Sequence, residues 1–160
     1  MNKTEELVKL LIEKKYTVSF AESCTGGKMA ASIVDIPDAS KVLNASFVTY
    51  SNEAKMKYTN VSEKTLEKYG AVSEETAVEM AEGTAKANNA EVAAGISGIA
   101  GPGGGTKDKP VGTVCFGYYI NGTLLSETIH FGDKGRNKVR DLSVAHVTHR
   151  LIEELKKQKM

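Results

Sequence analysis

The sequence predicts an α/β protein: a single-domain, three-layer α/β/α sandwich whose mixed sheet includes one β-hairpin at about residues 113–131. Two observations support this fold class. Segments with the periodicity of amphipathic helices alternate with short β-branched or small apolar runs. Two β runs near the C-terminus are joined by Asn121-Gly122, a strong signal for a tight hairpin turn. No repeat, linker or shift in composition divides the chain, so residues 1–160 are expected to form one domain.

Helices are expected where apolar residues recur at helical spacing behind a capping residue. Thr4 is the expected N-cap of the first helix, and Ser62 and Ser73 are expected to start two later ones. The expected helices cover residues 4–15, a stretch after Gly27 that ends near Val34, and residues 38–43, 52–58, 63–69, 74–88 and about 137–157.

The strands are expected between these helices. They cover residues 16–21, 45–50, 91–97, 113–120 and 123–131. The third contains small apolar residues that suit a buried position in the sheet. It leads into residues 98–112, a loop rich in glycine and proline, and a loop of this length inside a compact domain is usually functional or disordered.

The composition excludes several classes of partner. A formal net charge of +1 provides no field that would attract nucleic acid or an anionic membrane, and six tyrosines without tryptophan form no run of stacking aromatics. No apolar run approaches the about 18 residues of a membrane span, and the charged N-terminus does not resemble a signal peptide. Cys24 and Cys115 do not form a disulfide scaffold, which favours a reduced, cytoplasmic location.

No metal site or other cofactor is expected. His146 and His149 share a helix face, but no third ligand accompanies them, and neither a CxxC nor an HExxH pattern occurs. Two polar residues on a helix are the simpler interpretation.

Residues 47–55 place a tyrosine and a lysine at the end of a short strand. Tyr50 ends the strand and Lys55 follows about one helical turn later. Strand ends in α/β sheets are where ligand crevices form, and burial there can lower the pKa of a lysine until it acts as a base. Ser40 lies upstream and is a candidate nucleophile for such a base, although most Ser and Lys pairs are solvated surface residues.

Two glycine-containing turns could bind an anion. Residues 98–101 begin the long loop, where successive backbone N–H groups can form a nest, yet no P-loop, dinucleotide fingerprint or hydrolase elbow is present. Residues 22–27 lie between a strand and a helix, where Ser23, Thr25 and backbone amides could hold a phosphate or simply cap the helix. Cys24 is expected to be a buried thiol rather than a nucleophile.

Arg136 and Arg140 are four residues apart near the start of the last helix. They can therefore line one helix face beside the positive end of the helix dipole. This arrangement suits a phosphate or a carboxylate, and a solvated basic face is the alternative.

Five short motifs in order resemble the CinA C-terminal domain family, over about residues 5–155. They are Ala21-Glu22-Ser23-Cys24-Thr25-Gly26-Gly27, Val48-Thr49-Tyr50-Ser51-Asn52-Glu53-Ala54-Lys55, Gly70-Ala71-Val72-Ser73, Ser97-Gly98-Ile99-Ala100-Gly101-Pro102 and Lys109-Pro110-Val111-Gly112-Thr113-Val114. That family includes free-standing nicotinamide-nucleotide amidases, also called NMN deamidases, and the chain is similar to this free-standing form.

The resemblance implies hydrolysis of the carboxamide of nicotinamide mononucleotide (NMN) to nicotinate mononucleotide and ammonia, without metal or cofactor, in the recycling of pyridine nucleotides. It implies a Ser/Lys pair, Ser40 and Lys55, supported by Tyr50 and by Arg136, with Lys134 as the alternative for the arginine position. The implied substrate-binding residues are Ser23, Cys24, Thr25, Gly26, Gly98, Ile99, Ala100, Gly101 and Arg140. The expected partner is a small-molecule nucleotide, and a homodimer is expected. A non-catalytic pyridine-nucleotide-binding module and an amidohydrolase for a different amide are the alternatives.

Overall fold

The structure, a computed structural model, describes residues 1–158. The helices and strands in order are α1 Lys3–Lys14, β1 Val18–Glu22, α2 Lys28–Val34, the 3-10 turn η1 Ala39–Lys41, β2 Phe47–Val48, α3 Asn52–Thr59, α4 Glu63–Tyr69, α5 Glu74–Asn88, β3 Val92–Gly98, β4 Thr113–Ile120, β5 Thr123–His130 and α6 Arg136–Lys157. They alternate as far as β2, after which three helices, three strands and a last helix follow. The α/β class and the hairpin that were predicted from the sequence are confirmed.

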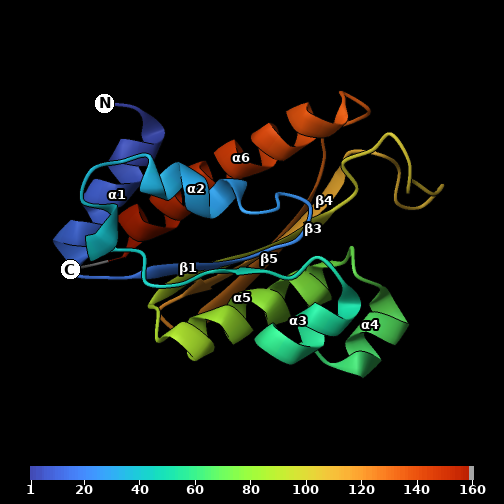
Figure 1. Ribbon diagram of the computed structural model, residues 1–160, viewed down its shortest axis with the longest axis horizontal. Coiled ribbons are helices and arrows are strands. Elements are labelled where there is room, and N and C mark those ends of the chain that lie inside the picture. The colour runs from blue at the N-terminus through green and yellow to red at the C-terminus, as the bar shows by residue number, and fades with distance from the viewer. Residues whose placement is uncertain (159–160) are drawn as a thin grey trace.

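The five strands form one mixed sheet in the order β2-β1-β3-β4-β5. β1 pairs in parallel with β2 and β3, whereas β3, β4 and β5 pair antiparallel. Helices α1, α2 and α6 cover one face of the sheet, and α3, α4 and α5 cover the other (Figure 1). The molecule is therefore the expected three-layer sandwich.

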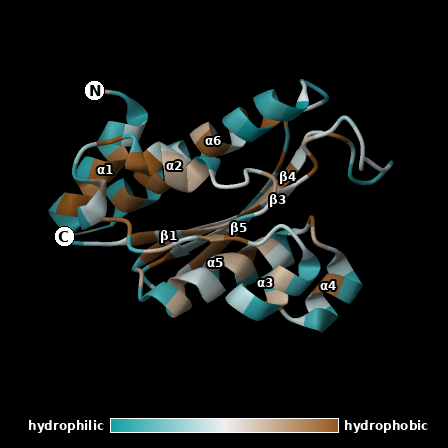
Figure 2. Ribbon diagram, viewed as in Figure 1, coloured by the Kyte–Doolittle hydropathy of each residue, from teal (hydrophilic) through white to brown (hydrophobic). Residues whose placement is uncertain are grey.

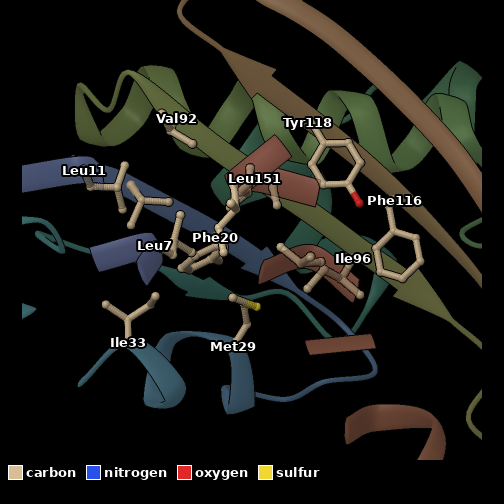
Figure 3. Close-up of a cluster of buried hydrophobic side chains, with 14 of the residues drawn as sticks. Leu7, Leu11, Phe20, Met29, Ile33, Val92, Ile96, Phe116, Tyr118 and Leu151 are labelled. Atoms are coloured by element: carbon tan, nitrogen blue, oxygen red, sulfur yellow. The ribbon is translucent and has the colours of Figure 1, made fainter. Parts of the chain in front are cut away.

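The main core lies between the sheet and the layer of α1, α2 and α6. The inward faces of these helices are apolar and their outward faces polar (Figure 2). Leu7 and Leu11 of α1, Met29 of α2 and Leu151 of α6 meet Phe20 of β1 there, all of them fully buried (Figure 3). Burial of this apolar surface is the main stabilising term of the fold.

The opposite layer packs closely through small residues. The face of α5 that meets the sheet is lined with alanine and threonine, and at Gly83 this helix touches α3. A Cβ added at Gly83 would lie 1.8 Å from the backbone oxygen of Thr59, so only glycine permits this approach. The contact fixes the position of α3, the helix that carries Lys55.

Three local expectations were wrong, and the first is the helix at residues 38–43, which is only the 3-10 turn Ala39–Lys41. α1 begins earlier than expected, and its N-cap is Asn2 rather than Thr4, because the Asn2 side chain accepts a hydrogen bond from the Glu5 backbone N–H. β2 is shorter than residues 45–50, because the N–H of Phe20 bonds to the Ser46 hydroxyl and not to a backbone carbonyl. Ser62 and Ser73 cap their helices as predicted.

The chain reverses its direction of winding at β1. From β1 it crosses through α2 on one face to reach β2, and from β2 it crosses through α3, α4 and α5 on the other face to reach β3. The carboxyl end of β1 is therefore the point where connections diverge to opposite faces. A crevice at such a switch point is the usual ligand site of open α/β sheets.

Candidate active site

The crevice at the end of β1 is a cleft of about 280 Å³. Five segments that are distant in the sequence contribute to its wall. The lining residues are Ser23, Cys24, Tyr50, Lys55, Ala71, Val72, Ser97, Gly98, Ile99, Ala100, Gly101, Gly103, Gly104 and Arg136. Most of the sequence-predicted site residues thus lie together at one edge of the sheet.

Lys55 is the most unusual residue of the cleft, because its side chain is only 1% exposed. It lies in the first turn of α3, which begins at the N-cap Ser51. Burial lowers the pKa of the Lys55 amine from its ordinary value to about 8. No carboxylate among the described residues forms an ion pair with it. A substantial fraction of Lys55 is therefore neutral near physiological pH.

Three oxygen atoms surround the Lys55 amine. Its Nζ lies 3.0 Å from Ser23 Oγ, 2.8 Å from the backbone oxygen of Thr49 and 3.4 Å from that of Tyr50. A neutral amine has two N–H donors and one lone pair. When the two carbonyls accept the N–H groups, the lone pair is directed at the Ser23 hydroxyl.

The serine beside Lys55 is Ser23 and not Ser40, so the expected pairing of Ser40 with Lys55 is corrected. Ser40 lies in η1, and the segment after η1 pairs with the opposite end of β1, where Val18 donates to the backbone oxygen of Val42. β1 spans about 16 Å at the usual rise per residue. Ser40 is exposed near the amino end of β1, whereas Ser23 follows its carboxyl end.

Glu22 determines how the turn after β1 is held. Its buried carboxylate accepts hydrogen bonds from the Thr25 hydroxyl at 2.6 Å and from the N–H groups of Gly27, Met29 and Ala30. This carboxylate occupies the positive end of α2, where residues 22–27 were expected to bind a phosphate. Neither that phosphate site nor a cap by Ser23 or Thr25 is formed, because Glu22 serves as the anion of this helix end.

Tyr50 and Arg136 form the opposite wall of the cleft. Arg136 Nη2 donates to the Tyr50 hydroxyl at 3.0 Å, and Nη1 donates to the backbone oxygen of Gly101 at 2.8 Å. The Tyr50 side chain is 62% exposed and does not reach Lys55, which contacts only the Tyr50 backbone. Arg136 therefore joins the start of α6 to the glycine loop, while Lys134 is not part of the cleft wall.

Arg140 lies behind the turn that carries Ser23, whereas Cys24 lines the cleft. The Arg140 guanidinium donates to the backbone oxygens of Cys24 and Thr25 and does not line the cleft. Burial raises the pKa of the Cys24 thiol to about 11. Cys24 is therefore a neutral thiol in the cleft wall, as expected from the sequence.

A larger groove of about 890 Å³ lies beside α5, β4 and β5, and it contains neither Ser23 nor Lys55. Its charged residues are mainly the acids Glu74, Glu75, Glu79 and Asp108. Its thiol, Cys115, has a pKa raised by burial. The contact between Ser23 and the buried Lys55 is in the smaller cleft, which we regard as the active-site candidate.

Among residues 1–158, no three His, Cys, Asp or Glu side chains come close enough together to hold a metal ion. His146 instead contacts Glu127, and His149 contacts Glu153. In the same part of the chain, no helix combines the length and the apolar character of a membrane span.

The sequence matches the CinA C-terminal domain family over residues 1–155. The chain belongs to this family. A putative competence-damage inducible protein of Alkaliphilus metalliredigens is 49% identical over 154 residues, which are 96% of this chain and 37% of that protein. One from Clostridioides difficile is 48% identical over 94% of this chain and 35% of its own length. The chain thus spans little more than a third of the length of these curated relatives.

Solved structures of CinA superfamily proteins have the same fold. One from Escherichia coli aligns with a TM-score of 0.91 at 39% identity, covering 94% of this chain and 87% of that chain. The competence/damage inducible protein from Agrobacterium tumefaciens aligns with a TM-score of 0.90 at 39% identity, covering 98% of both chains. Membership of the CinA family and its α/β fold are therefore shown, whereas none of these names states a reaction.

Sequence reasoning missed two functional features of this CinA domain. The sequence predicts a substrate-binding role for Ser23 and not its contact with Lys55. The available signal was its position directly after a strand, because position near a strand end was also the argument for Lys55. The sequence patterns predict no role for the Glu22 side chain, although Glu22 belongs to the predicted anion-binding turn. A buried acid just before a small-residue turn and a helix was the available signal for its capping role.

Proposed function

We propose that this CinA domain is an amidohydrolase that converts NMN to nicotinate mononucleotide and ammonia, with Ser23 as nucleophile and Lys55 as general base. The observation that carries this proposal is the 3.0 Å contact between Ser23 Oγ and the buried Lys55 Nζ, whose pKa is lowered to about 8. A serine hydroxyl needs a base, and a desolvated lysine supplies one at neutral pH.

In the first half-reaction, neutral Lys55 takes the proton of the Ser23 hydroxyl as Oγ adds to the carboxamide carbon of the substrate. A tetrahedral oxyanion forms. When it collapses, the carbon–nitrogen bond breaks, and the Lys55 ammonium returns its proton to the departing nitrogen, which leaves as ammonia. Ser23 then carries the nicotinoyl group as an ester.

In the second half-reaction, water takes the place of ammonia. Lys55, again neutral, accepts a proton from the water as its oxygen adds to the ester carbon. Collapse breaks the bond to Ser23 Oγ, which regains its proton from Lys55, and the carboxylate product leaves. The backbone oxygens of Thr49 and Tyr50 hold the amine in place through both halves.

The opposite wall of the cleft suits the nucleotide part of the substrate. Arg136 retains guanidinium N–H groups beyond those that bind Gly101 and Tyr50. It lies in the first turn of α6, where no acidic residue opposes the positive end of the helix. We assign the phosphate to this region, and the pyridine and ribose to the space between Tyr50 and the loop around Gly98 and Gly101.

The proposal is tested by incubating the purified chain with NMN and measuring ammonia and nicotinate mononucleotide together. Both products are expected in equal amounts from the wild-type chain. Lys55→Met, a substitution of similar length without a base, should lower kcat by about 10³-fold or more while the protein still folds. Near-normal turnover by this variant would contradict the proposed base.

The two alternatives give different results in the same experiment. Binding of NMN without release of ammonia would indicate a nucleotide-binding module. Ammonia released from other pyridine or nucleotide amides, but not from NMN, would indicate a different amidohydrolase.

A further inference from the structure

Arg140 holds the back of the turn that carries Ser23. Its Nε donates to the backbone oxygen of Cys24 at 2.9 Å, and its Nη2 donates to that of Thr25 at 3.1 Å. Nη1 bonds to Asn137 one turn earlier in α6. The guanidinium is half-buried and does not line the cleft, whereas Ser23 and Cys24 of the turn that it binds do.

These two hydrogen bonds fix the planes of the Cys24–Thr25 and Thr25–Gly26 peptide groups. In a trans peptide the C=O and the next N–H lie in one plane and point in opposite directions. An arginine that holds the Cys24 carbonyl therefore directs the Thr25 N–H away from itself. Within residues 1–158, the N–H groups of Cys24 and Thr25 donate to no backbone oxygen, whereas the Gly26 N–H donates to the Ser23 backbone oxygen at 3.1 Å.

The turn is held from a second side by Glu22. The carboxylate accepts from the Thr25 hydroxyl and from the Gly27 N–H, while the guanidinium lies against Gly26, where an added Cβ would be 3.2 Å from Nη2. Gly26 and Gly27 both have positive φ, so the turn has a shape that side chains seldom allow. A backbone held on both sides is rigid before a substrate arrives.

We infer that Arg140 is a positioning residue for catalysis: by binding the carbonyls of Cys24 and Thr25 it places the Ser23 hydroxyl at Lys55 and leaves the N–H groups of the turn free to stabilise the oxyanion. This inference rests on the proposed function of Ser23. It differs from the substrate-binding role that the sequence suggested for Arg140. The guanidinium donates to two backbone oxygens at once from two nitrogens in a fixed plane. Because a lysine ammonium cannot reproduce this geometry, Arg140→Lys should not restore the positioning of Ser23.

The first test compares kcat and KM for NMN in Arg140→Met, Arg140→Lys and the control Lys138→Met. Lys138 is exposed in the same helical turn and contacts no part of the Ser23 turn. Both Arg140 variants are expected to lose about 10- to 100-fold in kcat with little change in KM, because a small misplacement of a nucleophile has this effect. Added guanidinium should partly restore Arg140→Met, and Lys138→Met should match the wild type. A rise in KM at unchanged kcat would overturn the inference.

The second test does not depend on the substrate. A fluorophosphonate probe labels an activated serine, and the labelled residue is identified by peptide mass mapping. We expect equal labelling rates at Ser23 for wild type and Lys138→Met and a rate at least about 10-fold lower for Arg140→Met. This result would support the inference even if NMN is not hydrolysed. Equal rates for wild type and Arg140→Met, or no labelling of wild-type Ser23, would overturn it.

Discussion

At the scale of single residues, the proposed chemistry depends on one buried amine, that of Lys55. Lys55 is surrounded by neutral oxygens and by no carboxylate of the described chain, so desolvation of the ammonium dominates and lowers its pKa to about 8. A solvated lysine would be almost fully protonated at neutral pH. The position of Lys55 inside the sheet-end crevice, rather than its residue type, therefore allows its amine to accept a proton near neutral pH, as the proposed function requires.

The value of this pKa predicts how activity changes with pH. Because only neutral Lys55 can accept the Ser23 proton, kcat/KM should rise tenfold per pH unit below the pKa and reach a plateau above it, with the midpoint within about one unit of 8. Initial rates between pH 6 and 10 measure this. Lys55→Arg, whose guanidinium stays protonated, should be inactive throughout. A flat profile for the wild type would contradict the assignment of the base.

At the scale of secondary-structure elements, the start of α2 depends on a side chain from the preceding strand. Glu22 is fully buried and accepts one hydroxyl and three backbone hydrogen bonds. Removing it would leave these donors without a partner inside the protein. The start of α2 and the turn that carries Ser23 are therefore both stabilised by the same carboxylate, and loss of Glu22 should destabilise both.

Glu22→Ala is expected to lower the free energy of unfolding by about 2–4 kcal/mol, because several buried donors lose their acceptor at once. Urea denaturation of the variant and the wild type measures this difference. Glu63→Ala is the matched control, since Glu63 is an exposed glutamate in the first turn of α4, and it should change stability by less than about 1 kcal/mol. Similar small losses in both variants would contradict the role of Glu22.

The elements could largely be predicted from the sequence because their signals are local. The caps Ser62 and Ser73 and the Asn121-Gly122 turn act on adjacent backbone groups, and the structure confirms them. β2 was predicted too long because its extent depends on a side chain, Ser46, that replaces a backbone partner of β1. The sequence of residues 45–50 does not indicate that the Ser46 side chain, rather than the backbone, accepts the hydrogen bond from β1.

At the scale of the whole molecule, the order of the strands decides which serine meets Lys55. Ser23 and Ser40 lie on either side of α2, and the crossover through that helix places them at opposite ends of β1. Distance along the chain therefore misleads, because Ser40 is closer to Lys55 in sequence than Ser23 is. Local patterns identified the lysine, tyrosine, arginine and glycine loop of the cleft, but only the fold identifies the serine that lies beside Lys55.

The burial of Lys55 also predicts how the stability of the whole molecule depends on pH. Its pKa is about 8 in the folded chain and near its ordinary value of 10.5 in the unfolded chain. Between these values the unfolded chain binds more protons, so the free energy of unfolding should rise with pH by up to about 1.4 kcal/mol per unit. Below about pH 8 Lys55 is protonated in both states. The free energy of unfolding then no longer depends on pH through Lys55, and the folded chain carries the full cost of the buried ammonium.

Urea denaturation of wild type and Lys55→Met at pH values from 7 to 10 measures the effect. The difference in unfolding free energy between the two chains isolates Lys55, because the other titrating groups are common to both. We expect the wild type to gain stability relative to the variant as the pH rises from 8 to 10. A constant difference over this range would show that the pKa of Lys55 is not lowered.

The pairing of Ser23 with Lys55 is tested most directly by kcat for NMN hydrolysis in two matched serine variants. Ser23→Ala should lower kcat by about 10³-fold or more, because it removes the nucleophile, whereas exposed Ser40→Ala should stay within about twofold of the wild type. Thermal unfolding of both variants confirms that they fold. Normal turnover by Ser23→Ala, or loss of turnover in Ser40→Ala alone, would contradict the account.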